Sequence, residues 1–277
     1  MIKVNGKVLL VKQFSNSESK IGNIASYAKD GINTIELLYE TAVEGYNVNH
    51  DLMVLMFVKF ELDTLCRPVE LIFRVMPYQR MDRKCASDVF TLKMVCRYIN
   101  WLQFRRVIVI DPHSDVTLKL LNNAVAIYPI LQWLPIVKEK IGFDEKKDSI
   151  VFPDKGAAKK YEGCDLGKRV CYFSKKRDEE TSTIESFEKS NGEISEGSKC
   201  IIIDDICSSG KTLMLCARNL KKMGAGHVYI IVSHCEKIAL ENPIFTEENL
   251  MEKMFTSTSN MCYYHHKIEY LPVSIEV

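Results

Sequence analysis

The sequence lacks several features that would indicate a membrane, secreted or nucleic-acid-binding protein. No stretch approaches 18 uncharged apolar residues, and Lys12 interrupts the apolar run near the N-terminus, so neither a transmembrane helix nor a signal peptide is expected. The 37 basic and 36 acidic residues nearly cancel, which favours neither nucleic acid nor a membrane as partner. The ten cysteines include no C-x-x-C pair, and we interpret them as reduced core residues of a cytoplasmic protein.

One short segment, CYYHH at 262–266, contains residue types that bind metals. It has no partner pair at the spacing of a zinc site, so we expect no metal there.

Apolar β-branched runs alternate with segments of helical period. We expect strands at 7–14, 33–40, 69–78, 105–112, 124–130, 148–154, 168–174, 200–205 and 227–234, and helices at 51–66, 88–103, 131–142 and 212–226. Gly224 and Gly226 are expected to cap the last helix. Strands that alternate with helices predict an α/β fold of mainly parallel sheets flanked by helices. The expected strands and helices fall into two such alternating sets, which meet near residue 130. We therefore predict two domains, 1–128 and 129–277.

The polar segment between Asp178 and Lys199 has no clear period. It is interpreted either as a solvated loop with a short hairpin, or as a mobile lid, because the basic SKKRD segment lies at its root.

The most informative stretch is CIIIDDICSSGKT, at 200–212. A nucleotide-binding P-loop needs glycine where Asp205 stands, which excludes a Walker-type ATPase. A strand, a turn of small residues and a helix N-terminus present N–H groups that bind phosphate. Two carboxylates before such a turn suit the 2′ and 3′ hydroxyls of a ribose. The stretch therefore predicts a ribose-5-phosphate cradle made of Asp204, Asp205, Ser208, Ser209, Gly210, Lys211 and Thr212.

This stretch resembles the PRPP-binding motif of type I phosphoribosyltransferases and of PRPP synthetases (ribose-phosphate diphosphokinases). Five further segments resemble synthetase motifs in the synthetase order: QFSNSE (13–18), MPYQRMDRK (76–84), IDPHSD (110–115), VFPDKGAAKK (151–160) and FSKKRD (173–178). The resemblance spans roughly residues 7–240. DPHSDVT and DDIC look particularly like the short synthetase homologues of bacteriophages, which often accompany NAD-salvage enzymes.

The resemblance implies two tandem phosphoribosyltransferase-like domains, with ATP-side segments in the first and the cradle in the second. It implies attack by a ribose 1-hydroxyl on the β-phosphorus of ATP, with release of AMP. It also implies Mg²⁺ as cofactor. The catalytic residues implied are Lys175 and Arg177, on a flexible loop at about 175–198, and the metal ligands are His113 and Asp154. The residues implied to bind ATP are Phe14, Asn16, Glu18, Arg80, Asp82 and His113.

Other interpretations of these residues remain open. The basic residues at 175–177 also suit a solvated surface patch, and His113 also suits the cap of a turn. Glu18 also suits an acid at a helix N-terminus, and Asp111 would support His113. If Lys175 and Arg177 lie on a strand, they face one side and Lys176 the other.

The sequence departs from the synthetase pattern at five positions. Met81 replaces glutamine, Ser17 and Cys235 replace glycine, Ser208 replaces an acidic residue, and Lys211 replaces glycine. The cradle has thus lost a negative charge and gained a positive one, which favours a ligand with more negative charge than one 5-phosphate. ADP-ribose is therefore an alternative acceptor to ribose 5-phosphate.

Two further alternatives stay open. One is a phosphoribosyltransferase that consumes PRPP, and the other is a catalytically silent regulatory subunit. The ATP-like segments argue against the first, and the retained Lys175, Arg177, His113, Asp154 and Asp204 argue against the second. By resemblance we expect small-molecule substrates and a homo-oligomer, in the host cytoplasm if a phage encodes the chain.

Overall fold

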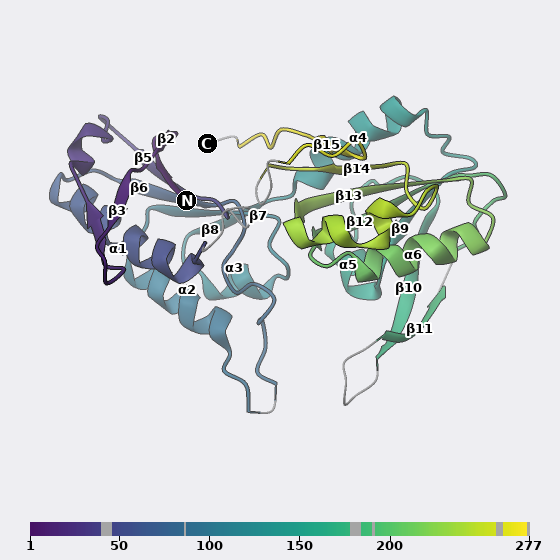
Figure 1. The fold of residues 1–277 in the computed structure, drawn as a ribbon, viewed down its shortest axis with the longest axis horizontal. Coiled ribbons are helices and arrows are strands. Elements are labelled where there is room, and N and C mark those ends of the chain that lie inside the picture. Colours follow the sequence, from purple (N-terminus) through teal and green to yellow (C-terminus); the bar gives the residue numbers. More distant parts are fainter. Residues whose placement is uncertain (40–45, 86, 178–183, 190–191, 259–262, 276–277) are drawn as a thin grey trace. The chain divides into compact units, whose positions relative to one another are not determined.

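The computed structural model describes residues 1–39, 46–85, 87–177, 184–189, 192–258 and 263–275, and for 174–177 and 184–189 it describes the backbone only. The chain divides into two compact units, Met1–Ile127 and Tyr128–Val277, where the sequence predicts 1–128 and 129–277. Each unit has its own main sheet with helices packed on it, which confirms the α/β prediction (Figure 1).

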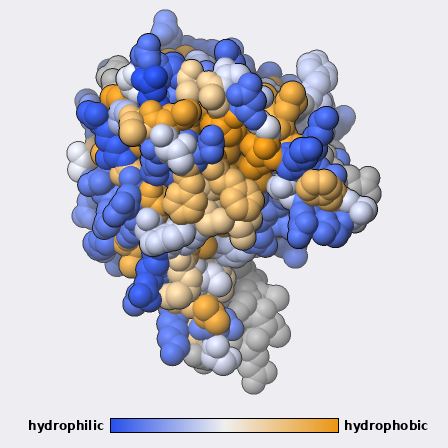
Figure 2. Space-filling model, turned by 90° about the vertical axis from the view of Figure 1, so that its left-hand side faces the viewer, coloured by the Kyte–Doolittle hydropathy of each residue, from blue (hydrophilic) through white to orange (hydrophobic). Residues whose placement is uncertain are grey.

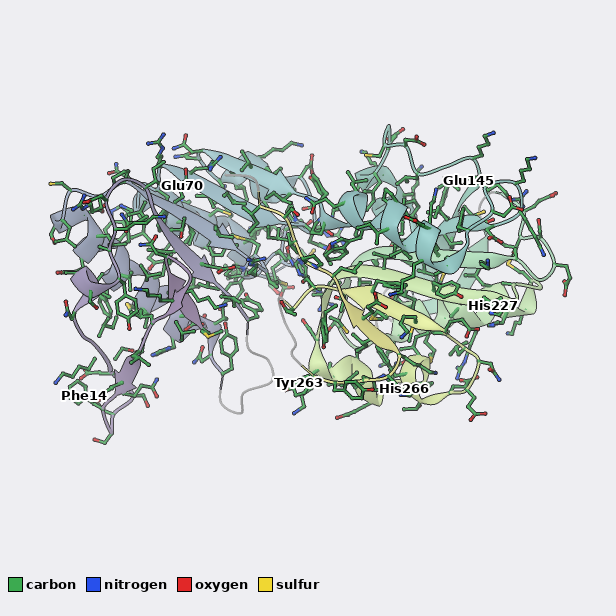
Figure 3. All side chains as sticks on the ribbon, turned by 90° about the horizontal axis from the view of Figure 1, so that it is seen from above. Phe14, Glu70, Glu145, His227, Tyr263 and His266 are labelled. Carbon is green, nitrogen blue, oxygen red and sulfur yellow. The ribbon has the colours of Figure 1, made fainter. Side chains whose placement is uncertain are left out.

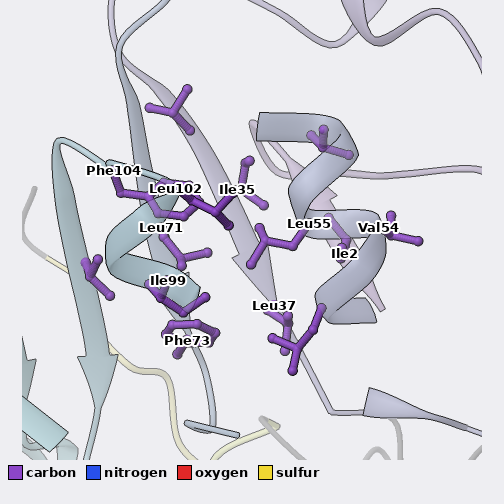
Figure 4. Close-up of a cluster of buried hydrophobic side chains, with 14 of the residues drawn as sticks. Ile2, Ile35, Leu37, Val54, Leu55, Leu71, Phe73, Ile99, Leu102 and Phe104 are labelled. Atoms are coloured by element: carbon purple, nitrogen blue, oxygen red, sulfur yellow. The ribbon is translucent and has the colours of Figure 1, made fainter. Parts of the chain in front are cut away.

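The first unit contains a six-stranded sheet of order β2-β1-β5-β6-β7-β8. Its strands are β1 (Ile2–Val4), β2 (Lys7–Val8), β5 (Asn33–Leu37), β6 (Val69–Phe73), β7 (Arg106–Ile110) and β8 (Ala124–Ile127). Strands β5 to β8 run parallel, and β1 joins β5 antiparallel. The helices are η1 (Ile24–Ser26), α1 (Val48–Thr64), α2 (Thr91–Trp101) and α3 (Val116–Leu120). Figure 4 shows part of the core, where Leu55 of α1 and Ile99 of α2 pack with Leu71 and Phe73 of β6.

The second unit contains a seven-stranded sheet of order β11-β10-β9-β12-β13-β14-β15. Its strands are β9 (Ser149–Phe152), β10 (Val170–Arg177), β11 (Ile184–Lys189), β12 (Lys199–Cys207), β13 (His227–Cys235), β14 (Lys253–Thr256) and β15 (Ile268–Tyr270). All neighbouring pairs are parallel except β10 and β11. The helices are α4 (Pro129–Ile141), α5 (Lys155–Lys160), α6 (Lys211–Lys222), η2 (Lys237–Glu241) and α7 (Pro243–Thr246).

The alternation of side chains along β12 explains why helices cover both faces of this sheet. Cys200 and Ile202 pack in one core cluster with Leu213 of α6. Ile201 and Ile203 pack in the other cluster with Trp133 of α4. A strand buried on both faces has a continuous apolar run, as the sequence shows here.

Several elements differ from the sequence prediction. The strand expected at 7–14 is two short pieces, β2 and β3 (Val11–Gln13), and β3 forms a separate hairpin with β4 (Ser19–Ile21). The segment after Asp178 contributes β11, which pairs with β10 as an antiparallel hairpin, in agreement with the interpretation of this segment as a loop with a short hairpin. Gly224 takes φ +95° directly after the C-cap of α6, as predicted. Within the described residues, no helix is both long and apolar enough to cross a membrane.

Candidate functional site

The predicted cradle lies at the end of β12 in the second unit. The strand was expected to end at Asp205, but it continues to Cys207, because the parallel register with β13 persists to the pair Cys207 and Cys235. The turn then runs through Ser208 and Ser209 to Gly210, and α6 begins at Lys211. The strand, turn and helix are thus arranged as the sequence predicts, with the turn two residues later.

The strand order supports a ligand site at this point of the sheet. After β9 the chain moves outward to β10, and then returns to β12 on the other side of β9. Ligands of open α/β sheets bind where the strand order reverses in this way, beyond the carboxyl ends of the two strands. The residue after Pro153 at the end of β9 is Asp154, and the end of β12 carries Asp204.

Gly210 makes the tight turn before α6 possible. It has φ +76° and ψ −6°, a left-handed conformation that side chains disfavour. A Cβ at this position would lie 3.1 Å from Cγ of Asn242. The first N–H groups of α6 have no partner within the helix, and they are available to a phosphate at this turn.

The two aspartates of the cradle differ in exposure. Asp204 is half-buried, and its Oδ1 accepts a hydrogen bond from the N–H of Asp205 at 2.9 Å. Asp205 is only 6% exposed. In this conformation the carboxylate of Asp204 is therefore the more accessible of the two to a sugar hydroxyl.

The structure adds a carboxylate to the cradle that the motif comparison missed. Ser208 Oγ donates a hydrogen bond to Glu236 Oε2 at 2.5 Å. Glu236 follows β13, and its N–H donates to the carbonyl of Cys207 at 2.8 Å. A hydrogen bond with Cys235 and burial raise the pKa of the Cys207 thiol well above its usual range, and the nearby charges of Asp204 and Glu236 add to this effect.

Glu236 corrects the charge comparison made from the motif alone. Ser208 replaces an acidic residue, but Glu236 brings a carboxylate to within hydrogen-bond distance of it, so the negative charge is retained from another strand. The added positive charge of Lys211 remains, and its side chain is exposed at the first residue of α6.

Asp154, a predicted metal ligand, caps a helix. Its side-chain Oδ1 accepts a hydrogen bond from the N–H of Ala157 at 2.8 Å, at the start of α5. A capping interaction of this kind is common for aspartate.

The side chains of the predicted catalytic residues Lys175 and Arg177 lie outside the described part of the structure, and so do residues 178–183 of the predicted loop. The backbone of β10 continues through Arg177 and pairs with β11. The pairing register shifts between Lys176 and Arg177, so the regular alternation assumed for these residues does not extend across that step.

In the first unit, the predicted ATP residues lie in the loops that follow two neighbouring parallel strands. Arg80 is exposed and Asp82 is half-buried in the loop after β6, and His113 is exposed in the loop after β7. The N–H of His113 donates a hydrogen bond to Oε1 of Gln79 at 3.0 Å, which joins the two loops. Asp111, expected to support His113, is fully buried and has φ +43°.

The predicted adenine residues lie in the turn of the β3–β4 hairpin, and Figure 3 shows Phe14 at this projecting hairpin. The N–H of Glu18 donates to Oδ1 of Asn16 at 3.2 Å. Because Glu18 lies in a hairpin, the alternative of an acid at a helix N-terminus is wrong. Ser17 has φ +68°, which explains why glycine is usual at that position.

A cavity of about 930 Å³ separates this hairpin from the start of α1. It is lined by Gln13, Phe14, Ser17, Glu18, Ser19, Tyr46, Asn47, Asn49, His50, Asp51, Met53 and Phe57. Aromatic rings beside amide and carboxylate groups suit a flat, polar-edged ligand such as a nucleobase. Within it, Ser19 Oγ and His50 Nε2 lie 2.7 Å apart, a contact that no sequence motif predicts.

The described residues contain no group of three or more histidine, cysteine, aspartate or glutamate side chains that could hold a metal ion. A Mg²⁺ ion commonly takes one or two protein ligands and completes its shell with substrate phosphates and water. The two predicted ligands belong to different units: His113 is exposed in the first, and Asp154 caps α5 in the second. Of the CYYHH segment, Cys262 lies outside the described residues, and burial lowers the pKa of His265.

Comparisons with known proteins agree with this architecture. The family described as "Phosphoribosyl transferase domain" matches residues 165–260, which include the whole cradle. A ribose-phosphate pyrophosphokinase of Pyrococcus furiosus is 27% identical over 172 residues, 61% of this chain and 59% of that protein. Ribose-phosphate pyrophosphokinase 2 of Schizosaccharomyces pombe is 25% identical over 259 residues, 91% of this chain and 77% of that protein.

The phosphoribosylpyrophosphate synthetase of Mycobacterium smegmatis has a similar fold, with a TM-score of 0.73, 17% identity, and coverage of 95% of this chain and 85% of that one. The cradle and its sheet thus define a phosphoribosyltransferase-type domain. The chain is thus similar in sequence to ribose-phosphate pyrophosphokinases and similar in fold to a PRPP synthetase. The match spans less than two thirds of the Pyrococcus furiosus protein.

Proposed function

We propose that this protein transfers the diphosphoryl group of ATP to the 1-hydroxyl of ribose 5-phosphate, giving PRPP and AMP. The observation that carries the proposal is the arrangement at the reversal of strand order, where Asp204 and Asp205 lie near the end of β12 and the turn Ser208–Gly210 leads into α6. The names of the relatives, ribose-phosphate pyrophosphokinases, support the same reaction.

In this proposal the second unit holds the acceptor sugar. The turn at Ser208–Gly210 and the first N–H groups of α6 bind the 5-phosphate, and Asp204 accepts hydrogen bonds from ring hydroxyls. The segment from Ser208 to Thr212 contributes hydroxyls and the cation of Lys211 at the same end of the helix.

The first unit, in this proposal, binds ATP. Arg80 pairs with phosphate oxygens, Asp82 accepts a hydrogen bond, and the hairpin residues Phe14, Asn16 and Glu18 frame the adenine. Lys175 and Arg177 stabilise the charge that develops on the transferred group. His113 and Asp154 would be protein ligands of Mg²⁺, which neutralises phosphate charge when bound.

ADP-ribose remains a candidate acceptor, with the same chemistry and a role related to NAD salvage. Lys211 still favours a second phosphate, but Glu236 restores the negative charge whose loss first suggested this substrate. Ribose 5-phosphate is therefore the better supported acceptor. A phosphoribosyltransferase that uses PRPP is the remaining alternative, and it offers no role for the first unit.

A direct competition decides between these substrates. The protein is incubated with Mg-ATP and equal ribose 5-phosphate and ADP-ribose, and products are separated by mass. The proposal expects AMP and PRPP as main products. A kcat/KM for ADP-ribose more than about tenfold higher, roughly 1.4 kcal/mol, would make ADP-ribose the main acceptor. Activity with PRPP and a base, but none with ATP, would overturn the proposed reaction with either acceptor.

We also propose a homo-oligomer. Met53, Phe57 and Phe60 form one exposed apolar stripe on α1, while its opposite face is buried in the core. A helix that is apolar on both faces is usually covered on both, and Figure 2 shows apolar side chains gathered on one face of the molecule. Phe57→Lys is expected to lower the mass seen by analytical ultracentrifugation, whereas an unchanged mass would exclude this face.

A further inference from the structure

The loops after β6 and β7 are joined by a side chain that the motif comparison passed over. Gln79 immediately precedes Arg80, and its Oε1 accepts the hydrogen bond from the N–H of His113 at 3.0 Å. Gln79 is only 3% exposed. This hydrogen bond is partly buried, and it joins the two loops at one fixed point.

The other end of the same amide has no partner. Only Oε1 can accept from an N–H group, so Nε2 takes no part in the hydrogen bond with His113. Nε2 is buried and makes no hydrogen bond within the described part of the chain. Leaving a buried donor unpaired costs about 1–3 kcal/mol, which a methionine or leucine at this position would avoid. The amide is therefore a costly choice for packing alone.

Strained backbone lies on both sides of this contact. Tyr78, next to Gln79, has φ +58°, and Asp111, two residues before His113, has φ +43°. Non-glycine residues with such angles persist only where their surroundings hold them, and they concentrate at ligand-binding sites. The bond between Gln79 and His113 is one of the interactions that hold these loops.

We propose that Gln79 is a positioning residue for nucleotide binding. Through Oε1 it holds the His113 loop against the Arg80 loop, so that both side chains meet the same polyphosphate. Its Nε2 gains an acceptor, a phosphate oxygen, when the loops close on that ligand. The inference rests on the proposed function only in taking ATP as the ligand of the first unit.

Two substitutions separate the parts of this role. Gln79→Glu keeps an oxygen acceptor for the N–H of His113 but replaces the donor with a negative charge. Gln79→Met introduces a side chain of similar length that has neither the acceptor nor the donor. Gln132→Met is the matched control, because the amide of Gln132 also bonds backbone: it accepts from the N–H and donates to the carbonyl of Ser274 in the second unit.

The experiment measures binding of a non-hydrolysable ATP analogue and of ribose 5-phosphate by calorimetry, with hydrogen exchange at the His113 amide. Both Gln79 variants are expected to bind the analogue at least tenfold more weakly, about 1.4 kcal/mol, and to bind ribose 5-phosphate within twofold of wild type. The His113 amide should exchange faster in Gln79→Met and stay protected in Gln79→Glu. The control variant should change neither the binding of the two ligands nor the exchange of the His113 amide.

Analogue binding within twofold of wild type in both variants would overturn the proposal. Equal losses for the analogue and ribose 5-phosphate would do the same, because they indicate a general structural defect. If Gln79→Met does not fold, Gln79→Glu alone decides. Because no turnover is needed, a wild-type protein that binds the analogue through Gln79 but forms no AMP would contradict the proposed reaction and leave this inference intact. A wild-type protein that does not bind the analogue would overturn both.

Discussion

Ser208 and Glu236 share a hydrogen bond of 2.5 Å that joins the turn after β12 to the residue after β13. The two residues stand 28 positions apart in the chain, and the parallel register of their strands brings them together. The acidic group of the cradle is therefore supplied from the neighbouring strand.

This relationship predicts that the two positions are coupled. Glu236→Gln should lower kcat/KM for ribose 5-phosphate about tenfold, because it removes a charged acceptor beside the sugar site. Ser208→Asp alone should be harmful, since it places two carboxylates together, and adding Glu236→Leu should restore activity. Steady-state kinetics on Ser208→Asp, Glu236→Leu and the variant with both changes measures the coupling. Simple additivity of the two changes would show that Glu236 does not replace the acid.

Gly210→Ala tests the turn. The left-handed backbone costs a non-glycine residue about 1–2 kcal/mol, and the added Cβ would meet Asn242. We expect a loss of about 1–3 kcal/mol in the free energy of unfolding, with weaker binding of ribose 5-phosphate. Gly22→Ala is the control, because its Cβ would meet nothing within 4 Å. Equal denaturation midpoints for the two variants would argue against the strained turn.

Ser17→Gly is expected to stabilise the protein. Ser17 has φ +68° in the β3–β4 turn, an angle that glycine adopts without strain. The gain in the free energy of unfolding should be about 0.5–1 kcal/mol, measured by urea denaturation. Ser15→Gly, at a neighbouring position without positive φ, should instead be neutral or slightly destabilising. A loss of stability in Ser17→Gly would contradict the assigned turn geometry.

The catalytic assignment predicts large effects on turnover with small effects on binding. Lys175→Ala and Arg177→Ala should each lower kcat about 10²-fold and leave KM nearly unchanged, as for contacts made mainly in the transition state. Lys176→Ala should be milder than Lys175→Ala, because successive residues of a strand face opposite sides. Three equal losses would point instead to a general electrostatic role of the basic segment.

The sequence predicts the parallel strands of both units well because their buried runs are apolar and bounded by turn residues. It also locates the cradle, since a strand, turn and helix N-terminus form a local pattern. It cannot show the contacts of Gln79 with His113 or of Ser208 with Glu236, because these depend on strand register across 34 and 28 positions. The β3–β4 hairpin was missed because its strands are short and exposed, with little hydrophobic alternation.

The most direct test of the proposed reaction follows the β-phosphorus of ATP. With β-labelled ATP, Mg²⁺ and ribose 5-phosphate, a diphosphoryl transfer moves the label into the sugar product and leaves unlabelled AMP. Label retained in ADP, or no transfer of label to the sugar, would contradict the account.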